Sequence, residues 1–318
     1  MNIIFQMIPH ALMIATPIVI AALGGMFSER SGIVNIALEG IMMVGAFVAA
    51  TITVQFELLE FGRSAAWISL LFAAVAGLLY SILLGFATIT FNADQTIAGT
   101  AINLLSGGIT VYLCQIIFNQ QRTETFRYGI SRLNNIPYLS QIPIIGDLFF
   151  KSIYPTVFIG VLLVLISYFV VFQTAFGLRL RSCGENPQAS ASMGINVAKM
   201  RYIGVLVSGA LAGLAGGIMV LTMGTQFSSA SIHGYGFIAL AALIFGKWNP
   251  FGVLGAGVFF GFSQVLGAYA SYIPILKLLP SEFYAAVPYV FTVVALILFS
   301  GKTMGPRAAG EIYDSGKR

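Results

Sequence analysis

The chain has 318 residues, of which 58% are hydrophobic and only 8% are charged. Soluble globular domains carry about 25% charged residues, so this composition excludes a soluble globular enzyme. The chain holds 16 Lys and Arg residues against 11 Asp and Glu residues, and its formal net charge is +5. In a membrane protein such an excess usually marks topology, so it does not indicate nucleic-acid binding.

The charged residues are clustered, which leaves long uncharged stretches that can each hold a membrane helix of about 20 residues. Hydrocarbon offers backbone groups no water to bond, so these stretches predict helices and not barrel strands. We predict one all-α transmembrane domain over residues 1–318, a polytopic helical bundle of about nine spans within a range of eight to ten. The span pairs at 65–118 and 251–300 would run in opposite directions, which is compatible with an inverted repeat. The expected spans are 3–26, 32–55, 65–91, 95–118, 153–173, 202–222, 234–247, 251–270 and 284–300.

Basic residues predict the orientation of these spans, because Lys and Arg accumulate in cytoplasmic loops. The 174–201 loop and the 301–318 tail are both basic, which predicts that both are cytoplasmic and that the N-terminus lies outside. The basic residues are Arg179, Arg181, Lys199 and Arg201 in the loop and Lys302, Arg307, Lys317 and Arg318 in the tail.

The 119–151 segment fits this rule poorly. It carries Arg122, Arg127, Arg132 and Lys151, yet a single span separates it from the basic 174–201 loop, so the two must face opposite sides. We therefore predict an external loop at 119–151. Its length, prolines and apolar stretches favour a folded external cap, and a plain solvated loop is the alternative.

Polar residues interrupt several apolar stretches. Asn35 and Glu39 are four residues apart, which predicts that both lie on one face of a helix. A carboxylate in hydrocarbon is costly, so we expect Glu39 to face a cavity or a partner group. Two interpretations stand: an interhelical hydrogen bond near the cytoplasmic rim, or a place on a substrate pathway.

Two further interruptions follow. Asp94 splits a long apolar stretch that continues to Asn103. It indicates either a tight cytoplasmic turn or a broken helix whose freed backbone lines a cavity. Gln226 and Ser229 belong to a polar segment between two later spans.

Glycines recur every four residues at Gly209, Gly213 and Gly217. Small residues at this spacing let helix backbones approach closely, because lipid supplies no hydrophobic drive for helix association. The stripe favours packing within the chain over a dimer interface.

The 174–201 loop contains a short helix with recognisable ends. Asn186 is a good N-cap, Pro187 suits the first helical position, and Gly194 suits the residue that stops the helix. These residues predict about two helical turns outside the membrane. The run Gln188-Ala-Ser-x3-Gly194 resembles a degenerate form of the EAA-x3-G coupling motif of ABC importer permeases.

Other segments carry the same resemblance. They are Gly184-Glu-Asn-Pro187, the Phe27–Phe47 segment, Gly234–Ala242 and Phe245–Pro250. Nearly the whole chain resembles the permeases of the branched-chain amino acid and simple-sugar group. The run Ser-Glu-Arg-Ser-Gly-Ile-Val-Asn within the Phe27–Phe47 segment is most similar to the nucleoside branch.

The resemblance implies a type II ABC importer permease in a bacterial cell membrane. It also implies a second related permease, with a heterodimer favoured over a homodimer, two cytoplasmic ATPase subunits, and an external lipoprotein that delivers nucleoside. The short helix would transmit closure of the ATPase to the spans. The residues expected to contact the ATPase are Gly184, Glu185, Asn186, Pro187, Gln188, Ala189, Ser190 and Gly194.

Catalysis is expected of the partner and not of this chain. Gly301-Lys302-Thr303 lacks the upstream glycine of a Walker A motif, since Leu296 stands at that position. ATP and Mg would therefore bind to the ATPase subunit, and we expect no cofactor, metal ligand or catalytic residue here. A membrane enzyme is unsupported, because no constellation of His, Asp and Glu with suitable spacing is present.

The substrate pathway has six candidate residues. Asn35, Asn103, Gln226 and Ser229 could bond to ribose hydroxyls or base edges, and Phe237 could stack on a base. Glu39 is the sixth candidate, as a carboxylate that would face the pathway. A ribose or simple-sugar permease of the same architecture is the first alternative. An ion-coupled secondary transporter is the second, but it needs membrane-embedded ionisable groups, and only Glu39 and Asp94 qualify.

Overall fold

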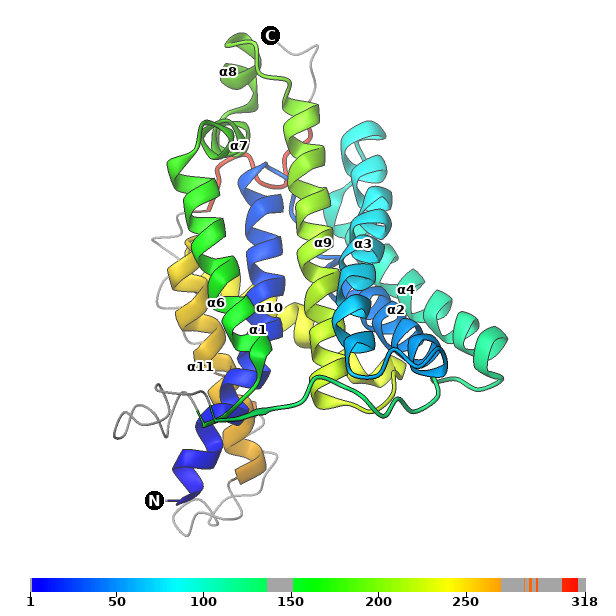
Figure 1. The fold of residues 1–318 in the computed structure, drawn as a ribbon. Helices are drawn as coiled ribbons and strands as arrows, with labels where there is room; N and C mark the ends of the chain where they lie inside the picture. The colour runs from blue at the N-terminus through cyan, green and yellow to red at the C-terminus, as the bar shows by residue number, and fades with distance from the viewer. Residues whose placement is uncertain are drawn as a thin grey trace.

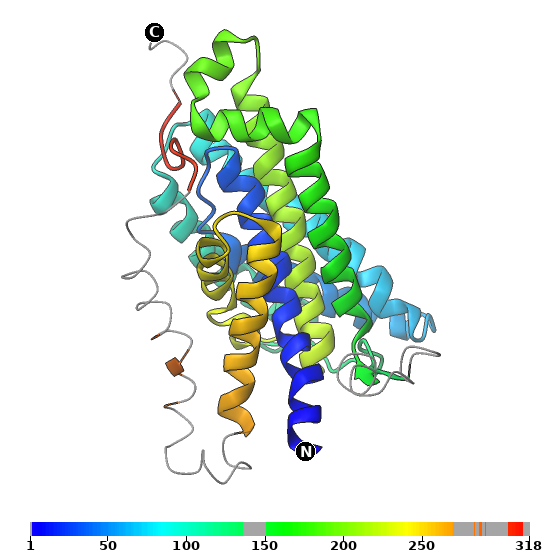
Figure 2. The ribbon, with the colours of Figure 1, turned by 90° about the vertical axis from the view of Figure 1, so that its left-hand side faces the viewer.

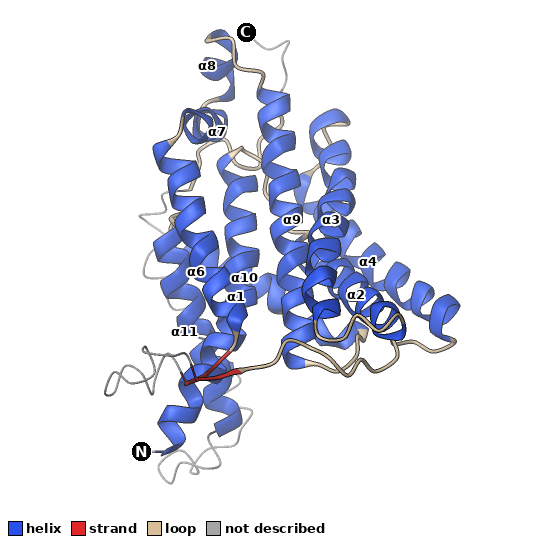
Figure 3. Cartoon of the chain, viewed as in Figure 1, coloured by secondary structure: helices blue, strands red, loops and turns tan. Residues whose placement is uncertain are grey.

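The computed structural model describes residues 2–135, 151–269, 283, 286–287, 290 and 305–313. Within them the chain is a helical bundle with one short antiparallel strand pair near the end that holds the N-terminus (Figure 3). The strands are β1 (Leu133–Asn135) and β2 (Lys151–Ile153). The helices of the first half are α1 (Asn2–Arg30), α2 (Leu38–Leu58), α3 (Ser64–Gly85), the π-helix η1 (Phe86–Thr90) and α4 (Gln95–Phe118).

The second half is also helical. Its elements are α6 (Pro155–Tyr168), the π-helix η3 (Phe169–Gln173), α7 (Ala175–Glu185), α8 (Pro187–Ser192), α9 (Val197–Met223), the 3-10 turn η4 (Ser229–Ile232), α10 (Tyr235–Phe245) and α11 (Pro250–Tyr269). Seven helices of the described residues are long and apolar enough to cross a membrane. The predicted polytopic α-helical class is therefore confirmed. The span predicted at 284–300 lies outside the described ranges.

Helix α1 is the centre of the bundle. It packs against α9, α11, α10 and α6, whereas α2 and α3 pack against the other side of α9 (Figure 1). The expected close packing of the glycine stripe is present within the chain: Gly77 on α3 faces Gly209 and Gly213, and a Cβ at Gly77 would lie 2.7 Å from the Gly213 Cα. Gly45 on α2 meets Gly213 as well. Backbones meet here because no side chain stands between them.

Two expectations about the spans are wrong in detail. The helix predicted from residue 32 begins at Leu38, so Asn35 is not on a helical face with Glu39. Gly32 adopts a φ of 101° after the end of α1, which turns the backbone out of the helix. The 234–247 span is α10, an 11-residue helix. At 1.5 Å per residue it covers about 16 Å, roughly half of the hydrocarbon core.

The interruption at Asp94 is a turn. Asp94 precedes α4 and its carboxylate accepts hydrogen bonds from the Thr96 and Ile97 amides at 2.8 and 2.9 Å, so it is the N-cap of α4. Figures 1 and 2 show where α7 and α8 lie: α7 runs across one end of the bundle, and α8 projects beyond it on the side of the C-terminus. The N-terminus lies at the opposite end.

Candidate functional site

The predicted capped helix in the 174–201 loop is present as α8. The Asn186 side chain accepts a hydrogen bond from the Ala189 amide at 3.0 Å, and Pro187 occupies the first turn. Gly194 follows the helix with a φ of 79°, a conformation that glycine adopts without steric cost. The caps read from the sequence therefore define a real helix, although it has only six residues.

The segment from the end of α7 into α8 has one outward face. Glu185, Asn186, Gln188 and Ala189 are exposed. The opposite face is buried: Gly184 lies against the carbonyl of Arg30, and Pro187 and Ser190 pack inward. The eight residues expected to contact a partner are thus split between an accessible face and an anchoring face. Gly194 is exposed at the end of the helix.

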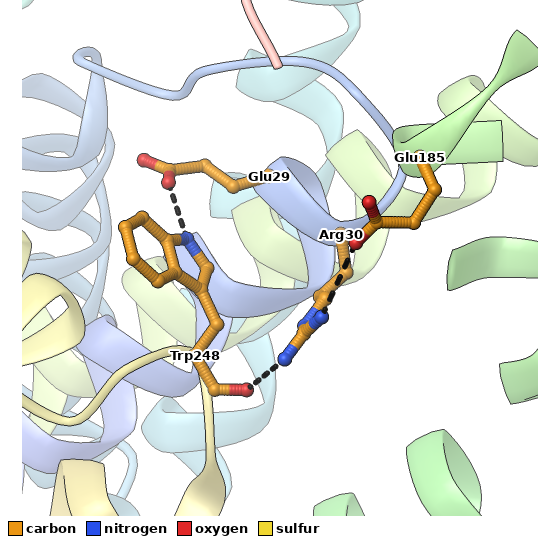
Figure 4. Close-up of polar contacts among 4 residues, drawn as sticks. All are labelled: Glu29, Arg30, Glu185 and Trp248. Atoms are coloured by element: carbon orange, nitrogen blue, oxygen red, sulfur yellow. Dashed lines mark hydrogen bonds and ion pairs between the residues drawn. The ribbon is translucent and has the colours of Figure 1, made fainter. Parts of the chain in front are cut away.

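A polar network ties this segment to the transmembrane helices (Figure 4). Glu29 is buried at the end of α1, and its Oε2 accepts a hydrogen bond from the Trp248 indole nitrogen at 2.6 Å. The Arg30 guanidinium donates to the Trp248 carbonyl oxygen at 3.1 Å and lies 3.9 Å from a carboxylate oxygen of Glu185. The end of α1, the turn between α10 and α11, and the end of α7 are therefore joined.

The tail residues 305–313 are a second tie. The Ala308 amide donates to the Gly184 carbonyl at 2.8 Å, and the Gly310 amide donates to the Gly32 carbonyl at 3.2 Å. Arg201, counted above as a loop charge, is only 2% exposed. Its Nη1 donates to the backbone carbonyl of Glu311 at 3.2 Å, and its guanidinium lies 5.8 Å from the Tyr313 ring centroid. We call α7, α8, residues 305–313 and the Glu29, Arg30, Arg201 and Trp248 side chains the basic end.

Sequence reasoning did not find this network. Glu29, Arg30 and Trp248 lie in the two motifs that carried the family resemblance, but nothing in their spacing shows that they touch. The Phe27–Phe47 segment nevertheless contains a signal: a glutamate and an arginine lie next to an apolar span. Charged groups beside the membrane interior need partners, so this pair indicates a polar contact. Trp248 supplies one, since an indole N–H needs an acceptor when it is buried.

A second polar group lies at the start of α10. Glu39 is buried, and its two carboxylate oxygens accept hydrogen bonds from the Gly234 and Gly236 amides, both at 2.6 Å. The first amides of a helix have no partner within the helix, so this carboxylate satisfies them and faces the positive end of the helix dipole. A Cβ at Gly236 would clash with the Glu39 backbone, so the contact needs a glycine.

Asn103 on α4 holds the same region from another side. Its side-chain oxygen accepts from the Gly40 amide at 2.7 Å, and its amide group donates to the Ile36 carbonyl at 2.9 Å. Phe237 on α10 directly follows Gly236 and is 50% exposed. We call Glu39, Asn103, Phe237 and the amides of Gly234 and Gly236 the α10 site.

The remaining pathway candidates are placed differently. Asn35 is buried, and its side-chain nitrogen donates to the Ser208 hydroxyl on α9 at 2.8 Å. Ser229 begins η4, which packs against α2 and α4. Gln226 lies in a segment that pairs with the 123–126 backbone, where the Phe126 amide donates to the Thr225 carbonyl at 2.9 Å. The structure thus places Asn103 and the start of α10, where Phe237 lies, around Gly40 and Glu39 of α2, whereas Asn35 is bound to α9.

This bundle of apolar helices, with a short half-length helix inside and a small capped helix outside, has the architecture of a multi-pass membrane permease. The family comparison agrees. Residues 7–299 match the family model described as "Branched-chain amino acid transport system / permease component", and the chain belongs to that family.

Two curated relatives are similar over almost their full length, and a third is similar over most of it. The chain is 45% identical to "Guanosine ABC transporter permease protein NupQ" of Bacillus subtilis, over 100% of this chain and 99% of that protein. It is 41% identical to "Nucleoside ABC transporter permease protein NupC" of Lactococcus lactis, over 99% of each. It is 27% identical to "Guanosine ABC transporter permease protein NupP" of Bacillus subtilis, over 90% of this chain and 78% of that protein. No solved structure matches the chain at a significant level.

Proposed function

We propose that the chain is the permease subunit of an ATP-driven importer of nucleosides. The observation that carries the proposal is the full-length similarity to two relatives that are both named as nucleoside or guanosine ABC transporter permeases, at 45% and 41% identity. The same proposal predicts a multi-pass protein of the bacterial cell membrane. Ribose or another simple sugar is the alternative substrate. The three relatives reported above are all named as nucleoside or guanosine permeases, which favours nucleosides.

The basic end is the cytoplasmic end in this proposal, and the N-terminus lies outside. Two observations support the orientation. Arg179, Arg181, Arg201 and Arg307 belong to this end, and cytoplasmic segments are rich in basic residues. The tail contacts Gly184 and Gly32, so the tail and the 174–201 loop are on one side, as their charges predict.

Coupling to ATP hydrolysis runs through α8. The exposed face at Gln188 and Ala189 would contact the cytoplasmic ATPase subunit, which binds ATP and Mg. Movement of α8 would reach α1 through the pair of Glu185 and Arg30, and would reach α10 and α11 through Trp248. Because these contacts join helix ends, a push on α8 tilts the helices together instead of deforming one of them.

Other subunits complete the importer. A second related permease forms the other wall of the pathway, and the occurrence of both a NupP and a NupQ in Bacillus subtilis supports a heterodimer. An external lipoprotein delivers the nucleoside at the face that holds the 119–135 segment. The α10 site would border the pathway, with the exposed ring of Phe237 available to stack on a base.

The test uses the substitution Ala189→Trp, which places a large side chain on the exposed face of α8. Uptake of radiolabelled guanosine should fall by at least about tenfold while the amount of permease in the membrane stays unchanged. Leu58→Trp, at an exposed position where α2 ends, is the control and should transport normally. Unchanged uptake by Ala189→Trp would overturn the role of α8.

A second arm separates the alternatives. Cells that lack only this subunit, and cells depleted of ATP that keep a membrane gradient, should both lose guanosine uptake, and ribose should not compete. Uptake that survives ATP depletion would instead identify an ion-coupled secondary transporter. Competition by ribose would identify a sugar permease.

A further inference from the structure

A pocket of about 280 Å³ lies between α8 and the tail. Glu185, Asn186 and Gln188 line one wall, and Arg307, Glu311 and Tyr313 line the other. One wall belongs to the end of α7 and the start of α8, and the other belongs to the tail, so the two walls are far apart in the sequence. The pocket therefore exists only because the tail is docked against the end of α7.

The tail is held mainly by backbone groups, and the Tyr313 ring, which lines the pocket, adds a contact with the Arg201 guanidinium. Its anchors are the amides of Ala308 and Gly310, which donate to Gly184 and Gly32, and the carbonyl of Glu311, which accepts from Arg201. The Glu311 carboxylate accepts none of these hydrogen bonds, but it attracts the Arg201 guanidinium electrostatically. Its side chain is exposed and contributes to the pocket wall.

The pocket differs in charge from its surroundings. The basic end is dominated by arginines, yet Glu185 and Glu311 both line the pocket, beside the ring of Tyr313. The described ion pair of Glu185 is a long contact with Arg30, at 3.9 Å. Two carboxylates and an aromatic face are the groups that recognise a guanidinium or an ammonium group. Arg307 in the same wall would oppose such a group.

We propose that the tail and α8 together form the docking surface for the ATPase subunit, and that the pocket receives a basic side chain of that subunit. This inference rests on the proposed function. The pocket is continuous with the exposed face of α8, because Gln188 belongs to both. A partner that contacts Ala189 therefore meets the tail as well. Docking on two segments fixes the orientation of the partner, which a helix of six residues cannot do alone.

The test measures binding of the ATPase to the purified, tagged permease complex in detergent. Glu311→Arg reverses a charge in the pocket; it retains the backbone carbonyl that accepts from Arg201 but also places a like charge near that guanidinium, which is why Glu311→Gln is tested beside it. The ATPase should then bind at least about tenfold more weakly, because like charges across an interface are strongly unfavourable. Glu124→Arg is the matched control, since Glu124 is exposed on the 119–135 segment, and it should bind normally.

Two further variants test whether the charge of the pocket decides binding and whether a loss of binding comes from misfolding of the tail. Arg307→Ala should leave binding unchanged or make it tighter, because it removes the opposing charge. Glu311→Gln should weaken binding less than Glu311→Arg, and it changes the tail so little that misfolding does not explain a loss. Normal binding by both Glu311 variants, or equal weakening by Arg307→Ala, would overturn the inference.

The proposed function can fail separately. If Ala189→Trp releases the ATPase and Glu311→Arg does not, α8 is the docking element and the tail is not. If neither variant releases the ATPase, the role of α8 fails with the inference. A cross-linker attached to the cysteine of Glu311→Cys identifies the subunit next to the tail in the same purified complex. It should capture the ATPase subunit. Capture of another subunit alone would contradict the docking surface.

Discussion

Two buried carboxylates ten positions apart in the sequence, Glu29 and Glu39, show how differently the chain uses its two polar regions. Glu39, at the α10 site, is satisfied by two backbone amides, so it belongs to a closed structural unit inside the bundle. Glu29, at the basic end, binds one side chain from a distant turn. Its neighbour Arg30 continues the network to an exposed residue, Glu185. Inside the membrane, polar groups hold helices together. At the end they also connect helices to a surface that a partner can reach.

The largest effect is expected at the α10 site. Glu39→Ala removes both acceptors of the α10 amides, and buried unpaired amides are costly, so we expect a loss of about 3 kcal/mol in the free energy of unfolding. Thermal unfolding of the purified protein in detergent measures it. Glu57→Ala is the matched control, because Glu57 accepts from the Arg127 and Tyr128 amides at 2.8 and 2.6 Å, but near the surface.

Water can replace Glu57, so Glu57→Ala should cost about 1 kcal/mol or less. Equal losses in the two variants would show that burial does not distinguish the two carboxylates. Glu39→Gln keeps one acceptor and should fall between wild type and Glu39→Ala.

A smaller effect is expected at the basic end. Trp248→Phe keeps an aromatic ring but loses the pyrrole part of the indole, with the N–H that binds Glu29, so the free energy of unfolding should fall by about 1–2 kcal/mol. Guanosine uptake should fall by more than the loss of folded protein accounts for, because the hydrogen bond between α1 and the turn before α11 is removed. The other tryptophan provides the control: Trp67 is 40% exposed on α3, and Trp67→Phe should change stability by less than about 0.5 kcal/mol. Normal uptake by Trp248→Phe would limit this network to a structural role.

The smallest effect concerns a thiol of the basic end. Burial raises the pKa of the Cys183 thiol. A raised pKa keeps the thiol protonated at pH values where an ordinary cysteine, with a pKa of about 8.5, is half ionised. Maleimide labelling of Cys183 should therefore be slow in the native protein at pH 8 and should increase after unfolding. Rapid labelling of the native protein would mean that α7 opens at this end.

The apolar stretches predicted the bundle well because each one must become a helix in lipid. The capped helix α8 was predicted too, since Asn186, Pro187 and Gly194 act on their own neighbours along the chain. The start of α2 was not predicted. Its position depends on Asn103 and Gln95, which bind the 34–40 backbone from a later helix, and nothing within that stretch reports those bonds.

The contacts between distant segments were decided by the tertiary structure alone. The sequence by itself determined the membrane class, most of the helices, the family and the two ends of α8, because hydropathy and capping are properties of neighbouring residues. Only the fold placed Trp248 on Glu29, Glu39 on the amides of α10, and Arg201 under the tail, because these partners are separated by long stretches of chain. The physical reason is that a buried polar group must find a partner wherever packing provides one, and packing is a property of the whole bundle.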